Sequence, residues 1–97
     1  MDQGKLNAAP SDARDIDATL RALLADTLGL GAGRVAAFDG ETELFGSLPE
    51  FDSMAVANLL TGIEERLGVV IDDDDVEAED FSSYGRLLAF AERLALR

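Results

Sequence analysis

Apolar residues recur at helical spacing in three separate segments of this 97-residue chain, and this periodicity constrains the fold more than any other feature. Within each segment the apolar positions lie three or four residues apart, which places them on one face of a helix. The three stripes are Ile16, Leu20, Leu23, Leu24 and Leu28; Val56, Leu59, Leu60, Ile63 and Leu67; and Leu87, Leu88, Ala91 and Leu94. No stretch of useful length alternates apolar and polar residues as a half-buried strand would. The sequence therefore predicts an all-α fold.

Capping residues and glycines set the expected ends of the first two main helices. The first helix is expected to begin near residues 11–15 and to end at the glycine-rich residues 29–33. The second is expected over residues 53–67, since Asp52 is a good N-cap and Gly68 can adopt the left-handed conformation that ends a helix.

A short helical turn over about residues 74–80 and a last helix over about residues 83–96 complete the set. Tyr84 and Phe90 are expected at the edges of the last apolar stripe. The predicted fold is a small four-helix bundle, with three main helices and a short third helix.

The segment between the first two helices, residues 31–51, has no sustained period and is interrupted by glycines. Loops of this length inside a small domain are uncommon and are often functional. Because the segment also holds several apolar residues, we expect a long ordered loop that is pinned to the helices by Leu44, Phe45 and Leu48.

The chain is long enough for one domain. Residues 1–14 are small and polar and are expected to form a flexible N-terminal leader, with residues 15–97 as the folded domain. No apolar run is long enough to span a membrane, and the first residues lack the apolar core of a secretory signal. We therefore expect a cytoplasmic protein without stable membrane insertion.

Charge and composition argue against several classes of function. The formal net charge is −12, from 20 acidic and 8 basic residues, so a nucleic-acid backbone would be repelled and a basic protein partner is favoured. The chain has no cysteine and no histidine, which removes the usual nucleophilic thiol, thiolate metal ligands and the general base most active near neutral pH. An enzyme is therefore not expected, and neither is a metal site.

The stretch "LPEFDSMAV", residues 48–56, places Ser53 in the first turn of the predicted second helix. A serine there can simply cap the helix. It can also offer an exposed hydroxyl for covalent attachment of a phosphate group, which the positive end of a helix favours. The residues themselves leave both readings open, so a plain acidic helical adaptor that binds other proteins remains the alternative function.

The segment "LFGSLPEFDSMAVANLLTGIEERLGVVI" resembles the acyl carrier proteins, the phosphopantetheine-binding family. The family has Asp-Ser-Leu at the start of its second helix, and here the triplet is Asp52, Ser53 and Met54. The preceding "ETELF" and the closing "IEERLGV" are also similar to the family. The sequence around the serine looks similar to that of specialised bacterial carriers such as those associated with exosortase systems.

The resemblance implies that Ser53 is the attachment site of a covalent 4′-phosphopantetheine derived from coenzyme A, whose thiol carries acyl intermediates as thioesters, in lipid or polyketide biosynthesis for example. It implies that Asp52 caps the helix and assists modification, and that Met54 contacts partner enzymes. The implied partners are a phosphopantetheinyl transferase, which requires Mg²⁺, and an acyl-loading ligase or acyltransferase with a basic docking surface. The carrier itself is expected to be a monomer.

The sequence departs from the family on the outer face of the second helix, where carriers often present acidic residues. The residues expected on that face are Ala55, Ala57, Asn58, Thr61 and Gly62, with the acidic Glu64 and Glu65 only at its far end. The acidic residues lie instead in the run from Asp72 to Asp80, which is expected to be the docking surface. Four adjacent aspartates lack the spacing of a calcium loop, so a solvated acidic connector or a helix N-terminus is the expected structure there.

Overall fold

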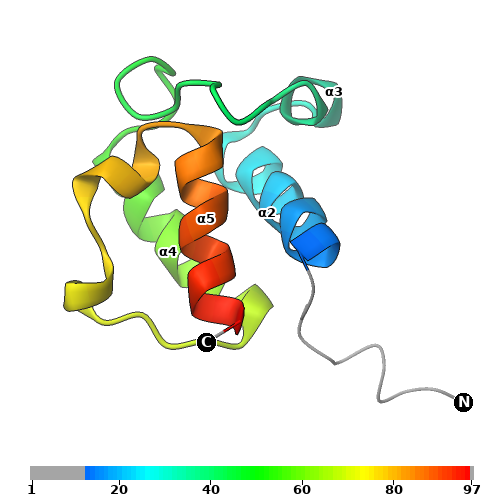
Figure 1. Ribbon diagram of the computed structural model, residues 1–97. Coiled ribbons are helices and arrows are strands. Elements are labelled where there is room, and N and C mark those ends of the chain that lie inside the picture. Colours follow the sequence, from blue (N-terminus) through cyan, green and yellow to red (C-terminus); the bar gives the residue numbers. More distant parts are fainter. Residues whose placement is uncertain (1–12, 97) are drawn as a thin grey trace, which may run out of the picture.

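The computed structural model describes residues 13–96, and three helices form its framework. These are α2 (Ala13–Leu28), α4 (Ser53–Leu67) and α5 (Tyr84–Leu96). Both α4 and α5 begin at the end of the bundle that the green loop covers, whereas α2 runs the opposite way (Figure 1). The described residues contain no strand, and Glu43 and Ser83 form an isolated antiparallel bridge. The predicted all-α bundle is therefore confirmed.

The predicted helix ends agree closely with the structure where they can be compared. The helix α4 spans the residues expected for it, and Gly68 after it has φ 67°, the left-handed conformation that lets its N–H reach the carbonyl of Glu64 at 3.0 Å. Gly29 ends α2 with φ 70°. Most of the expected leader, residues 1–12, lies outside the described residues, while Ala13 and Arg14 already belong to α2.

The core joins all three apolar stripes with residues from the connecting segments. Its most completely buried large side chains are Tyr84, Phe90, Ile16, Leu24, Leu44, Leu59, Ile63 and Leu87. The expectation that Tyr84 and Phe90 lie at the edge of the last stripe is wrong, because the loop before α4 and the segment before α5 cover them. Leu88, expected in the stripe, is only half-buried.

The inner face of α4 is wider than the apolar stripe suggests. Ala55 and Gly62 were expected on its outer face, but both are buried. Gly62 lies against Leu23 of α2, so closely that a Cβ atom at Gly62 would collide with the end of the leucine side chain. The missing side chain at Gly62 allows α2 and α4 to approach each other.

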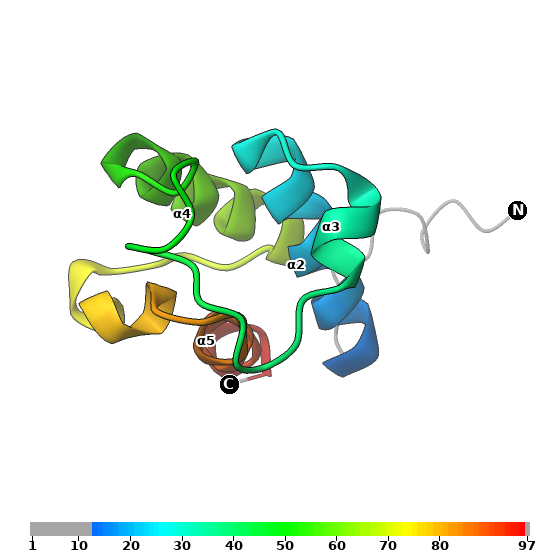
Figure 2. The same ribbon diagram turned by 90° about the horizontal axis from the view of Figure 1, so that it is seen from above.

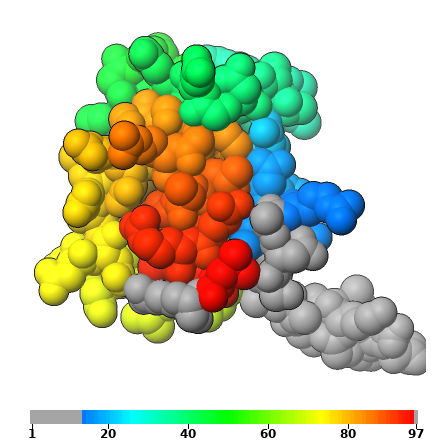
Figure 3. Space-filling view, viewed as in Figure 1, coloured from blue at the N-terminus to red at the C-terminus, as the bar shows by residue number. Residues whose placement is uncertain are grey.

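The segment before α4 is not wholly a loop, because it contains the short helix α3 (Ala32–Ala36). The sequence did not predict this helix, because the glycines at positions 31 and 33 disfavour helical structure. Arg21 of α2 fixes it, since its guanidinium donates to the carbonyl oxygen of Val35 at 2.6 Å, and the Val35 side chain is buried. From above, the segment crosses the ends of the helices (Figure 2), and it covers the end of the bundle where α5 begins (Figure 3).

Backbone hydrogen bonds join this covering segment to the start of α5. The N–H of Leu44 donates to the carbonyl of Ser82 at 3.0 Å, and the N–H of Tyr84 donates to the carbonyl of Thr42 at 2.8 Å. Leu44 is fully buried, as its role as a loop anchor requires. The other expected anchors differ: Leu48 is half-buried, and Phe45 is 48% exposed, so Phe45 is not a core anchor.

The connector between α4 and α5 forms two 3-10 turns where one short helix was expected, η1 (Asp73–Asp75) and η2 (Ala78–Phe81). Each turn carries its own reciprocal cap, in which the backbone N–H of Asp72 donates to Asp75 and that of Glu77 donates to Asp80. These local caps stop the segment twice and prevent one continuous helix.

Candidate functional site at the start of helix α4

The first turn of α4 is closed by Asp52 and not by the serine that follows it. Asp52 is the N-cap, and its Oδ1 accepts the backbone N–H of Ala55 at 2.9 Å. Its φ of −103° and ψ of −175° are the extended values usual for that position. The predicted capping role of Asp52 is therefore confirmed.

Ser53 is the first helical residue and its side chain is exposed. Within residues 13–96 no group hydrogen-bonds to its hydroxyl. The sequence left open whether this serine caps the helix or serves as an attachment site. Capping by Ser53 is no longer supported, because the Asp52 carboxylate already accepts a free backbone N–H of the first turn. What remains is a primary alcohol, open to solvent, at the positive end of a 15-residue helix.

An apolar pocket of about 250 Å³ opens beside this hydroxyl. Its lining comes from the loop before α4, the first turns of α4 and the connector before α5. The lining residues are Phe45, Ser53, Val56, Val76, Ala78 and Phe81. Phe81 is buried, and Val76 is partly buried and packs against the core. The pocket itself was not predicted, because its walls come from three segments that are distant in the sequence.

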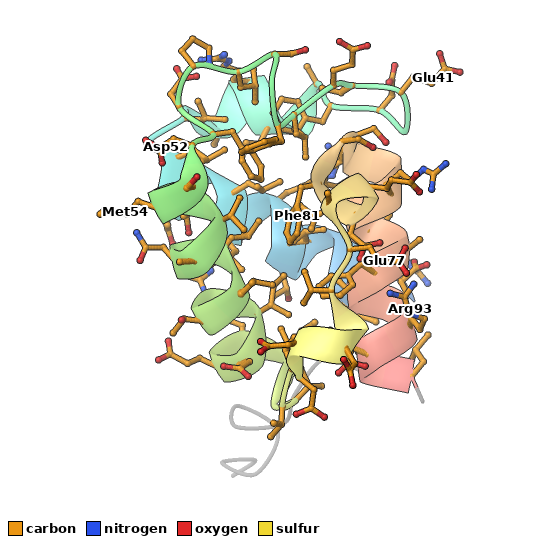
Figure 4. The ribbon with its side chains drawn as sticks, turned by 90° about the vertical axis from the view of Figure 1, so that its left-hand side faces the viewer. Glu41, Asp52, Met54, Glu77, Phe81 and Arg93 are labelled. Atoms are coloured by element: carbon orange, nitrogen blue, oxygen red, sulfur yellow. The ribbon has the colours of Figure 1, made fainter. Side chains whose placement is uncertain are left out.

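Two of the lining residues, Phe45 and Phe81, belong to a row of aromatic rings that continues into the core. Phe81 lies between Phe51 and Phe90, with ring centroids 6.3 Å and 6.1 Å away. Phe45 meets Phe51 edge-on at 6.0 Å. Figure 4 shows Phe81 between α4 and α5, while Met54 points away from the bundle.

The residues close to the serine in sequence include an exposed apolar side chain and a charged one. Met54 is 71% exposed, which is high for so large an apolar residue. Glu50 forms an exposed ion pair with Arg34 at 3.2 Å. A backbone hydrogen bond, followed by the Arg34 guanidinium, lowers the pKa of Glu50 from its ordinary value.

Two carboxylates of the acidic run belong to its own turns. Asp75 and Asp80 accept the capping hydrogen bonds, and Asp80 also lies 3.9 Å from Arg93. Asp73 and Asp74 are exposed on η1. No cluster of three or more potential metal ligands occurs in the described part of the chain.

Comparisons with known proteins agree with this geometry. Residues 18–91 match the family model described as "phosphopantetheine attachment site". The solution structure of a holo acyl carrier protein from Nitrosomonas europaea is similar, with 38% sequence identity, a TM-score of 0.71, and coverage of 80% of this chain and 92% of that one. A comparison with curated proteins finds no significant match.

A helical bundle that matches this family model over residues 18–91 defines a phosphopantetheine-dependent carrier domain. The chain belongs to the acyl carrier protein family, and it carries acyl groups on a covalent 4′-phosphopantetheine. Proteins of this family are carriers rather than catalysts, and they interact with a phosphopantetheinyl transferase and with acyl-handling enzymes. Among residues 13–96 no helix is both long and apolar enough to cross a membrane.

Proposed function

We propose that the Oγ atom of Ser53 is the point at which phosphopantetheine is attached. The observation that carries the proposal is the division of roles at the start of α4: Asp52 caps the helix, which leaves the Ser53 hydroxyl exposed and without a partner among the described residues. The chemistry needs a primary alcohol that an enzyme can reach, and this serine provides one.

In the attachment step, Ser53 Oγ bonds to the phosphorus next to the pantetheine arm of coenzyme A. The diphosphate P–O bond breaks, 3′,5′-ADP leaves, and the hydroxyl proton passes to a base of the transferase. Mg²⁺ bound by the transferase neutralises the charge of the diphosphate. Once attached, the group supplies a thiol that holds acyl groups as thioesters.

The residues beside Ser53 suit this group. The product is a phosphodiester with one negative charge, and the N-terminus of α4 stabilises an anion at that place. Asp52 holds the first turn in position, so it assists the modification as a positioning residue. Met54 projects from the same turn, and its flexible, exposed side chain suits contact with partner enzymes.

The proposed partners include an acyl-loading ligase or acyltransferase whose docking surface is basic. The support is the net charge of −12, together with the exposed carboxylates of η1. Opposite charges on two partners accelerate their encounter.

The attachment is tested by intact-mass measurement after incubation with coenzyme A, Mg²⁺ and a broad-specificity phosphopantetheinyl transferase. The wild type should gain one phosphopantetheine, and Ser53→Ala should gain none. Ser47→Ala is the matched control, since Ser47 is an exposed serine in the loop that precedes α4. Modification of Ser53→Ala would move the site elsewhere, and an unmodified wild type would contradict the proposal.

A further inference from the structure

We infer that Met54 is an oxidation site, and that its oxidation controls how enzymes dock at the start of α4. A peroxide converts the Met54 thioether to the sulfoxide, and the sulfoxide weakens the docking of an enzyme that acts on Ser53. The inference rests on the proposed attachment at Ser53, because that reaction brings an enzyme against the turn from which Met54 projects.

The side chain of Met54 is open to solvent, although methionine is usually buried. It is 71% exposed, it points away from the bundle in Figure 4, and it belongs neither to the core nor to the pocket lining. The next two residues, Ala55 and Val56, supply the packing of this turn against the core. A chemical change at the Met54 sulfur therefore leaves the packing of the bundle as it is.

Sulfur is rare in this chain. It has no cysteine and two methionines, Met1 and Met54, of which Met1 lies outside the described residues. Among residues 13–96, Met54 therefore holds the one sulfur atom. Mild peroxides oxidise the sulfur-containing side chains. Before a thiol-bearing arm is attached, a peroxide that reaches this part of the chain is thus directed to Met54.

The oxidation step needs no group of the protein other than the sulfur. A lone pair of the Met54 sulfur forms a bond to one oxygen of hydrogen peroxide, and the O–O bond breaks. The other oxygen takes up the proton of the first and leaves as water. Sulfur loses two electrons and the peroxide gains them. Hydrogen peroxide is uncharged, so the net charge of −12 does not repel it.

The position of Met54 determines what its oxidation changes. Ser53 and Met54 are consecutive residues in the first turn of α4, so an enzyme that bonds to Ser53 Oγ has to place its own surface against this turn. Covering an apolar side chain is favourable, whereas covering a sulfoxide oxygen without a hydrogen-bond donor is unfavourable. Oxidation therefore turns a favourable contact into an unfavourable one.

The change can be reversed. Methionine sulfoxide is reduced by two enzymes, one for each epimer of the sulfoxide, and the exposure of Met54 leaves the sulfoxide within their reach. Leucine at this position would offer a similar apolar contact and could not be oxidised. Methionine thus adds to the docking turn a sensitivity to peroxide that can be switched on and off.

The experiment measures phosphopantetheine attachment to the full-length unmodified carrier before and after treatment with hydrogen peroxide. Peptide mapping by mass spectrometry should place one added oxygen on Met54, at a rate close to that of free methionine in the same solution. The kcat/KM of a broad-specificity transferase should then fall at least about fivefold. Treatment with the two sulfoxide reductases should restore it.

The melting temperature separates a docking effect from a folding effect. Because Met54 is exposed, the oxidised carrier should melt within about 4 °C of the untreated one. A larger fall would attribute the lost activity to the fold and would contradict the inference.

Met54→Leu is the matched control, since it keeps Met1 and removes only the sulfur of α4. Each protein is compared with its own untreated sample, and peroxide should leave the kcat/KM of Met54→Leu unchanged. Met54→Gln places a polar group at the same position without any peroxide. Its untreated kcat/KM should therefore be lower than that of untreated Met54→Leu.

Three results would overturn the inference: oxidised carrier that is modified as fast as the untreated protein, an equal fractional loss in peroxide-treated Met54→Leu, or resistance of Met54 to peroxide that oxidises free methionine. Equal rates for Met54→Gln and Met54→Leu would also contradict it. An untreated wild type that gains no phosphopantetheine is a different outcome, and it counts against the attachment at Ser53.

Discussion

The Oδ1 atom of Asp52 accepts the backbone N–H of Ala55 at 2.9 Å, and this contact closes the first turn of α4 immediately beside the proposed attachment site. Asp52→Ala should therefore lower the free energy of unfolding by about 1 kcal/mol, the usual cost of losing an N-cap side chain. Chemical denaturation with a circular-dichroism readout measures the change.

Asp52→Asn and Ser53→Ala are the comparison variants for the cap. Asparagine keeps a side-chain oxygen that can accept the same N–H, so most of the stability should return. Ser53→Ala should be close to the wild type in stability, because its hydroxyl has no hydrogen-bond partner within residues 13–96. A loss in Ser53→Ala as large as that in Asp52→Ala would show that the serine shares the cap.

Gly40, in the loop before α4, lies in close contact with Gly85 at the start of α5. A Cβ atom at Gly85 would lie 2.6 Å from the carbonyl oxygen of Gly40 and 3.0 Å from its Cα, and these are backbone atoms that cannot rotate away. The N–H of Gly85 also donates to that oxygen at 3.1 Å. Gly85→Ala should therefore destabilise the fold by about 1–3 kcal/mol, as overpacking usually does.

The matched control is Gly33→Ala in α3, where a Cβ atom would meet nothing within 4 Å. Alanine favours helix over glycine, so this variant should be neutral or more stable by up to about 1 kcal/mol. Equal stabilities of the two variants in thermal or denaturant unfolding would contradict the tight join at Gly85.

The helices were predictable because their signals are local. Asp52 and Gly68 stand at the two ends of the α4 stripe, and each acts on backbone groups within one turn of itself. The burial of Tyr84 was not predictable, since it depends on Phe38 and Arg21, which approach from other elements: the Phe38 ring lies 5.9 Å away and the Arg21 guanidinium lies 4.5 Å above the tyrosine ring.

The candidate site, like the fold, could be predicted from the sequence only in part. The position of Ser53 at the helix start follows from the triplet and the stripe, which are read directly from the chain. The pocket beside it requires Phe45 and Phe81 to be paired through the backbone, and nothing in the local sequence of either residue specifies the other. A pocket with walls from separate segments becomes visible only when the fold is known.

Burial, together with the neighbouring carboxylate of Asp17, raises the pKa of the Tyr84 hydroxyl above its ordinary value. Tyr84 donates from that hydroxyl to Asp17 Oδ1 in the folded protein. Above about pH 10 the unfolded chain loses the tyrosine proton while the folded protein keeps it, so the free energy of unfolding should fall as the pH rises further. Below that pH this contribution is fully present.

Tyr84→Phe separates this effect from other alkaline titrations. It removes the hydroxyl and keeps the ring, so it should cost about 1 kcal/mol at neutral pH and should make the decline above about pH 10 less steep. Urea unfolding between pH 7 and 11 measures both quantities for the two proteins. Parallel curves for variant and wild type would exclude Tyr84 as the source of the slope.

The exposed acids of η1 offer a test of docking that leaves the fold intact. Asp73 and Asp74 are exposed and take no part in the reciprocal caps of the connector, whereas Asp75 and Asp80 do. Reversing the charge of Asp73 and Asp74 with lysine should slow association with a basic partner such as the transferase. The slowing should be largest at low salt, because charges at the surface are screened as ionic strength rises.

The matched control is Glu41→Lys, an exposed charge reversal in the covering loop, on the side of the molecule away from Met54 (Figure 4). Long-range attraction depends on the net charge of the protein, wherever the charge lies. Glu41→Lys should therefore also slow association, but by less for each charge changed than the η1 reversal does. A larger effect per charge in η1 would mark η1 as part of the contact surface, because short-range pairing adds to the general field. Equal effects per charge at the two places would leave only the general field and would remove η1 from the interface.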